Sequence, residues 1–461
     1  MKTQNETGAR PGLAFAIICL GSFLAPLLVH SSTLGIPAMS KSLDMDASAI
    51  SWFPLALVVG NAIAQFPAGR LGDMFGHNRV FVAGLLIAAT ASLLGGLAIN
   101  GAMVTAARFM QGVGNAAIFA TAMALISDLY SVEQRGKIMG VYLAIGYLGV
   151  TGGPLFGGLV IGLFGWRPVF LIPVAFFLLA AIAGHYRLPP KKAHGVNPQR
   201  FDFTGTLLYG LAIAITASSL LRINDKGSSL ALFAGLALLG LFVLHQRGKL
   251  HPLIDFRLFL ENRTFGFSCL VLLFLQGGIY AVPFVATLYL QYIQALSPQS
   301  AGLILMLQAV STAIIALFSG RFIGRVSNVR LIAIGIGMGL AGMIFIILAD
   351  TGTNFALIPM GLVAIGACAG LVETPAINFM MGCVAEDQRG SASAALNSAR
   401  MFGSLVGISA ISALMNLYLG DTMITPAVYA ELALAVQGYF LIAALMIGLC
   451  GASLFLASRS A

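Results

Sequence analysis

Glu373 is the carboxylate whose position favours proton chemistry. It lies well inside a long apolar run, directly before Thr374 and Pro375, whereas the other acidic residues fall in loops, tails or helix ends. A charge at the centre of a membrane span costs about 2.5–3.5 kcal/mol on insertion scales, so it needs a function or a partner. A carboxyl group in a low-dielectric environment can take up and release a proton near neutral pH. We therefore expect Glu373 to carry a proton or bind a cation, with a structural pairing to Arg400 as the alternative.

Three basic side chains also lie well inside apolar runs: Arg108, Arg400 and His30. Arg108 has no acidic residue in its own run, so backbone carbonyls or another helix must satisfy it. Arg400 precedes the small residues Gly403 and Gly407, which favours hydrogen bonding at a packed interface as much as a functional role. A histidine titrates near physiological pH, so His30 is a candidate for proton coupling, with a hydrogen-bonded packing role as the alternative.

Uncharged polar side chains inside the apolar runs are candidates for lining a solute cavity. Their amide and hydroxyl groups can bind a ligand, or each can simply bond a neighbouring helix. The candidates are Asn61, Gln65, Asn115, Gln276, Tyr280 and Asn378.

A glycine-rich segment, GVTGGPLFGG at residues 149–158, interrupts another apolar run. Gly149, Gly153 and Gly157 recur every four residues and form a bare stripe that a second helix can approach closely. Pro154 cannot donate a hydrogen bond, so we expect it to release the carbonyl of Val150 and bend the helix. A bent helix with a smooth face suits two halves that rock against each other.

The elements that position these residues are membrane-spanning helices. The chain has 461 residues, of which 59% are hydrophobic and only 9% charged, against about 25% charged in soluble domains. Continuous apolar runs of about 20 residues favour helices over barrel strands, which would alternate. Fourteen such runs lie near 13–38, 49–69, 80–99, 101–127, 138–163, 167–186, 204–222, 228–246, 264–290, 299–319, 329–349, 354–380, 390–416 and 434–457.

The distribution of Lys and Arg predicts the orientation. With both termini in the cytoplasm, 19 of the 25 basic residues fall in cytoplasmic loops or ends. Only Lys41, Arg167, Arg222 and Lys226 fall outside. Cytoplasmic loops retain Lys and Arg, so this asymmetry supports an even number of spans in a bacterial inner membrane. The net charge of +9 then reflects topology, and the dispersed basic residues give no support to nucleic-acid binding.

Two pairs of loops indicate an internal repeat. GRLGDMFGHNR (69–79) aligns with GRFIGRVSNVR (320–330), and EQRGKIMG (133–140) with EDQRGSAS (386–393). Each pair falls between the same two helices of a six-helix unit, and parallel six-helix repeats are typical of secondary transporters. The predicted divisions are a tail at 1–12, an N-terminal half at 13–186, a linker at 187–203, two inserted helices at 204–246, a linker at 247–263 and a C-terminal half at 264–461.

Four features together resemble the major facilitator superfamily over nearly the whole chain. The 69–79 loop is similar to the GxLxDRxGRK loop, RFMQGVG (108–114) to the RxxQGxG motif, and 149–158 to the GxxxGPxxGG motif of antiporters. GWR (165–167) and PLIDFRLF (252–259) are similar to elements of the fourteen-helix drug:proton antiporter branch, the type that exports quaternary ammonium compounds and other drugs.

The resemblance implies an all-α membrane fold of two six-helix repeats plus two inserted helices. It implies proton-coupled export of amphipathic or cationic compounds by alternating access, and hence antibiotic resistance. It places the six polar candidates on cavity-lining helices and links Arg108 to proton coupling. Conformational roles are implied for Asp73, Gly69, Gly76, Arg79, Gly149, Gly153, Pro154, Gly157 and Arg400.

The sequence departs from the family pattern at two places. Met74, His77 and Asn78 stand where the loop pattern has Arg, Arg and Lys, which predicts a weaker conformational latch. The stretch 24–33 lacks the carboxylate that branch members commonly carry in the first helix, and offers His30 instead.

The expected energy source is the proton gradient, with no cofactor and no metal. The sequence has no Walker A motif, and its five scattered cysteines form no CxxC pair. The expected partners are a small-molecule substrate, protons and the lipid bilayer, around a monomer. The alternative function is proton-coupled transport of a specific metabolite such as an amino acid, siderophore or sugar-like solute. A membrane sensor or enzyme has no soluble domain or catalytic cluster to support it.

Overall fold

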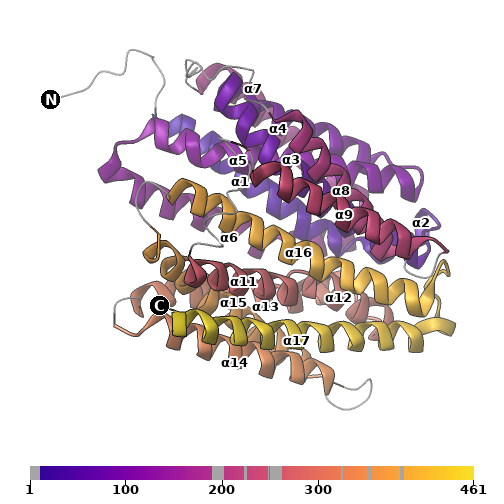
Figure 1. Cartoon of the computed structure of the whole chain (residues 1–461). Coiled ribbons are helices and arrows are strands. Elements are labelled where there is room, and N and C mark those ends of the chain that lie inside the picture. The colour runs from indigo at the N-terminus through magenta and orange to yellow at the C-terminus, as the bar shows by residue number, and fades with distance from the viewer. Residues whose placement is uncertain are drawn as a thin grey trace. The chain divides into compact units, whose positions relative to one another are not determined.

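The computed structural model is built from helices and describes residues 11–188, 202–222, 226–247, 249, 262–322, 325–349, 355–384 and 389–460 (Figure 1). Within this part of the chain, 14 helices are long and apolar enough to cross a membrane. Helices satisfy every backbone polar group inside one segment, which hydrocarbon demands. The predicted all-α fold with fourteen spans is confirmed.

Some sequence predictions lie wholly or partly outside the described residues. They concern the PLIDFRLF segment at 252–259, most of the linkers at 187–203 and 247–263, residues 1–10 of the tail, and residues 386–388 of the second repeated loop.

The chain divides into two compact units. Unit 1 comprises Met1–Asp44 and Ala56–Gly210. Within it, α1 packs against α6 and α7, and α4 packs against α5 and α7. Its helices are α1 (Pro11–Thr33), α2 (Ile36–Ser42), most of α3 (Ala47–Phe75), α4 (His77–Gly96), α5 (Gly101–Leu129), α6 (Val132–Phe164) and α7 (Arg167–Arg187).

Unit 2 comprises Met45–Leu55 and Leu211–Ala461, so the division falls within α3 and α8. In unit 2, α15 packs against α13 and α14, and α11 packs against α16 and α17. Its helices are the later part of α8 (Phe203–Leu221), α9 (Ser228–Arg247), α11 (Arg263–Ile279), α12 (Val282–Leu288), α13 (Pro298–Phe322), α14 (Asn328–Ile347), α15 (Leu357–Gly382), α16 (Arg389–Leu419) and α17 (Tyr429–Ser460).

Polar side chains fix where several helices begin. The Asn100 side chain accepts a hydrogen bond from the Met103 amide at 2.8 Å, at the start of α5. Asn262 accepts from the Phe265 amide at 2.9 Å in the same way before α11. These caps satisfy amide groups that the first helical turn leaves without a partner.

Two predicted spans are interrupted. The run 13–38 is not one helix, because α1 ends at Thr33 and α2 begins at Ile36. Pro37 lies in the first turn of α2, where its missing N–H is not needed. The run 264–290 also breaks, between α11 and α12, and Pro283 again occupies a first turn. Mean hydropathy does not detect these breaks, because apolar residues predominate in the run around each of them.

The helix α3 is longer than its predicted apolar run of 49–69, since it continues to Phe75. The extension carries Asp73 into the last turn of the helix. Gly76 follows with φ +99° and sits at the N-terminal end of α4. This backbone conformation is open to glycine and strained for other residues.

Candidate functional site

An ion pair between Glu373 and Arg400 joins α15 to α16 in unit 2. The guanidinium Nη2 contacts the carboxylate Oε1, and the side chains are 11% exposed for Glu373 and 35% for Arg400. Each charge alone would be costly inside a membrane span, and each offsets the other here. The structure thus brings together the two charged residues that lie within apolar runs of the C-terminal half.

The helix α11 reaches the same region. Gly403 lies one turn beyond Arg400 on α16, and a methyl group added to it would lie 3.0 Å from Gln276 Cβ. Gly407, one turn further, is packed against the backbone of Gly277. Gln276 therefore lies against the helix that carries Arg400, about one turn along α16 from the residue that pairs with Glu373.

The other two polar candidates of unit 2 lie at different points of the same helices. Tyr280 follows the end of α11, and its amide donates to the Gln276 carbonyl at 2.9 Å. Asn378 lies on α15 beyond Glu373, and its side chain is exposed.

A buried polar network surrounds Arg108 in unit 1, where this side chain is only 1% exposed. Its Nη1 donates to Ser32 Oγ on α1 at 3.1 Å and to Gln111 Oε1 at 2.9 Å. The Gln111 Nε2 in turn donates to Ser92 Oγ on α4 at 3.4 Å. Uncharged oxygens on α1 and α5 therefore accept from this charge, and α4 joins the network through Gln111. Sequence reasoning missed Gln111 as a site residue, although its i,i+3 spacing from Arg108 was the available signal.

The polar candidates of unit 1 lie along α3 and α5. Asn61 packs close to Gly112, where an added methyl group would lie 2.7 Å from the Asn61 amide nitrogen. The Asn61 Oδ1 is buried and has no hydrogen-bond partner within the described residues, so it could accept from a ligand. Asn115 is buried one turn beyond Gln111, and Gln65 is half-buried one turn beyond Asn61.

The glycine stripe of α6 lies against α1. A methyl group on Gly153 would lie 2.6 Å from His30 Cβ, and one on Gly157 would lie 2.6 Å from the Ser31 carbonyl oxygen. Gly149 meets the Phe23 carbonyl oxygen in the same way. The helix itself runs unbroken through Pro154. The backbones of α1 and α6 are in contact along this stripe, and half-buried His30 lies beside it.

A glycine and an aspartate–histidine pair shape the junction of α3 and α4. The Asp73 Oδ1 lies 3.3 Å from the buried His77 Nε2. Gly76 between them has φ +99°, whereas Gly69 has open space where a methyl group would lie. Arg79 is exposed. His77, which replaces an expected arginine, is therefore a partner of Asp73 that sequence reasoning did not identify.

The cysteines are free thiols: Cys19, Cys269, Cys368 and Cys450 are buried, and Cys383 is half-buried. Within the described residues, no group of three or more His, Cys, Asp or Glu side chains could hold a metal ion.

The sequence matches the family model of the Major Facilitator Superfamily over residues 17–408. It is 25% identical over 430 residues to the multidrug resistance protein Stp of Mycobacterium tuberculosis, covering 92% of this chain and 78% of that protein. It is 24% identical over 403 residues to the riboflavin transporter RibZ of Clostridioides difficile, covering 87% of each.

The fold is similar to that of a bacterial homologue of the human lysosomal transporter Spinster, solved in an inward-facing, unoccupied conformation. The TM-score is 0.68 at 15% sequence identity, and the match covers 98% of each chain. The similarity at this identity concerns the fold alone.

Proposed function

Because the chain belongs to the Major Facilitator Superfamily, we propose that it is a proton-driven exporter of amphipathic or cationic drugs. The chain is a multi-pass membrane protein and a secondary transporter of small molecules, not an enzyme. Similarity to Stp, which is named a multidrug resistance protein, supports drug export as the specific transport function.

The observation that carries the proposal is the Glu373–Arg400 ion pair. Protonation of the carboxylate removes its charge and releases the guanidinium. When the carboxylate is ionised, a cationic substrate and Arg400 compete for the same oxygens. Proton and substrate therefore bind in alternation, which is what antiport requires. The ion pair keeps the empty site neutral between the two events, so that no isolated charge remains in the span.

Other residues support the same cycle. We assign Arg108 and His30 to proton coupling in unit 1, and the close α1–α6 contact to the alternating motion of the transporter. Both termini lie in the cytoplasm of a bacterial cell in this proposal. The polar groups that would contact solute are Asn61, Gln65, Asn115, Gln276, Tyr280 and Asn378.

Everted membrane vesicles test the proposal directly. With a cationic dye as substrate, the native protein should accumulate dye when a proton gradient is present and lose it when an uncoupler is added. Glu373→Gln mimics the protonated state permanently and should abolish gradient-driven transport. Asp421→Asn, at an exposed carboxylate, is the matched control and should transport normally. Gradient-driven transport by Glu373→Gln at the native rate would refute the assignment.

A second candidate is transport of one defined metabolite, which the similarity to the riboflavin transporter RibZ favours. Buried amides such as Asn61 and Asn115 suit hydrogen bonding to a polar solute. Competition in the same vesicles separates the two functions. Inhibition of dye uptake by many unrelated cations supports drug export, whereas inhibition by a single metabolite supports the second candidate.

A further inference from the structure

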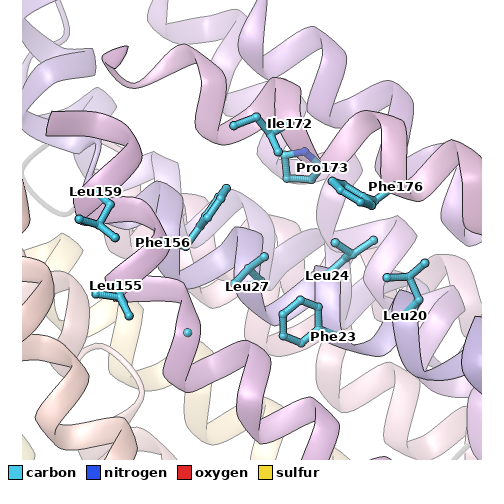
Figure 2. Close-up of a pocket in the computed structure, with 11 residues that line it drawn as sticks. Leu20, Phe23, Leu24, Leu27, Leu155, Phe156, Leu159, Ile172, Pro173 and Phe176 are labelled. Carbon is cyan, nitrogen blue, oxygen red and sulfur yellow. The ribbon is translucent and has the colours of Figure 1, made fainter. Parts of the chain in front are cut away.

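An apolar furrow runs along α1 in unit 1, between α6 and α7. Figure 2 shows its wider part, where Leu24 and Leu27 of α1 face Phe156 of α6 and Phe176 of α7. This part is a cavity of about 510 Å³. A second cavity of about 370 Å³ shares Leu20 and Phe23 with it and continues to Phe15. The two cavities form one furrow along α1.

The length of the furrow is close to the hydrocarbon thickness of one bilayer leaflet. The combined lining of the two cavities extends from Phe15 to Leu27 of α1. Twelve residues of helix rise about 18 Å, and half of the hydrocarbon core of a bilayer is about 15 Å thick. The furrow therefore has the length of a single hydrocarbon tail that lies along a membrane helix.

The lining of the furrow excludes water. The side chains around its wider part are all apolar, and Leu24 and Leu27 at its base are buried. Leu159 and Phe176 at its edge are 48% and 46% exposed, so the furrow is open at the surface. A bound water needs two to four polar partners, and this lining offers none. Since α1, α6 and α7 all span the membrane, hydrocarbon is the solvent available to fill the furrow.

We propose that the furrow binds one hydrocarbon tail of a bilayer phospholipid. Gly152 keeps it open: a methyl group added there would meet only Leu27 Cδ1, at an ordinary 3.6 Å. The neighbouring Gly153 is different, because it lies directly against α1. Adjacent glycines of α6 thus have separate uses, one for helix contact and one for tail binding. The bound tail packs against three helices of unit 1 and stabilises them, whatever substrate is transported.

Photolabelling of the full chain tests the site. The purified protein is reconstituted in phosphatidylethanolamine vesicles that contain a trace of phospholipid with a diazirine in one acyl chain. Adducts should concentrate in the α1 and α6 peptides that contain Leu24 and Leu155. Gly152→Phe fills the furrow with its own side chain and displaces two or more methylenes of the tail, so labelling of these peptides should fall roughly tenfold.

Gly448→Phe is the matched control, because Gly448 is an exposed glycine of α17 with open space where a side chain would lie. It should leave labelling of α1 and α6 unchanged. Phospholipid should also raise the melting temperature of the native protein in detergent more than that of Gly152→Phe. Equal labelling of the native protein and Gly152→Phe would overturn the proposal. Displacement of the lipid probe by a transported cationic dye would overturn it too, since the furrow would then be a substrate site.

Discussion

The buried charged groups Arg108 and Glu373 have different kinds of partner. Arg108 donates to neutral oxygens of Ser32 and Gln111, whereas Glu373 is paired with the opposite charge of Arg400. A hydrogen bond from a guanidinium to a neutral oxygen does not depend on pH, whereas protonation of a carboxylate breaks an ion pair. In the proposed cycle, the Arg108 network therefore supports proton coupling as a fixed charge beside the α1 helix, and the Glu373 pair is the proposed switch.

The Arg108 network should contribute measurably to stability. In Gln111→Leu the guanidinium loses an acceptor at 2.9 Å, and an unsatisfied buried polar group costs about 1–3 kcal/mol. We expect a clearly lower melting temperature in detergent. Gln134→Leu, at an exposed glutamine at the start of α6, should change the melting temperature little. Equal effects of the two substitutions would show that the network is not stabilising.

At the scale of the helix, the role of a glycine in α6 depends on whether it faces a neighbouring helix. Gly157 lies against the backbone of Ser31, whereas Gly146, on the same helix, has open space. The four-residue spacing of Gly149, Gly153 and Gly157 predicts a contact stripe from sequence. It does not identify α1 as the partner, because that choice depends on how the helices pack within the unit.

Alanine substitutions should separate the two kinds of glycine. In Gly157→Ala the new methyl group would lie 2.6 Å from a carbonyl oxygen and 2.7 Å from the Ser31 Cα, so α6 must move away from α1. We expect lower thermal stability and little or no transport, with insertion into the membrane intact. Gly146→Ala should be neutral or stabilising by up to about 1 kcal/mol, since alanine favours helix. Normal transport by Gly157→Ala would contradict the role of the stripe.

At the scale of the whole molecule, the fourteen candidate spans and the loop charges predict a topology with both ends in the cytoplasm. Sequence alone yields this expectation, because apolar length and the placement of Lys and Arg are read directly from residue types. The expected sides of exposed Lys137 and Lys226 are opposite: cytoplasmic for the first and external for the second.

Labelling of an introduced cysteine checks this topology. The background is Cys383→Ser, since the other cysteines are buried and buried thiols react poorly. On intact cells, a membrane-impermeant maleimide should label Lys226→Cys. It should label Lys137→Cys only after the cells are made permeable. The reverse pattern would invert the proposed orientation and with it the direction of export.

Residue types alone predict the all-helical membrane fold and the fourteen spans, because both depend on local composition and length. They also identify Glu373, Arg108 and Arg400, since a charge within an apolar run is conspicuous without any structure. Only the tertiary structure showed that Arg400 faces Glu373 and that Ser32 bonds Arg108. These partners lie on different helices, and their proximity depends on the packing of whole elements. The same packing leaves the furrow beside Gly152 open, which no spacing of residues along the chain predicts.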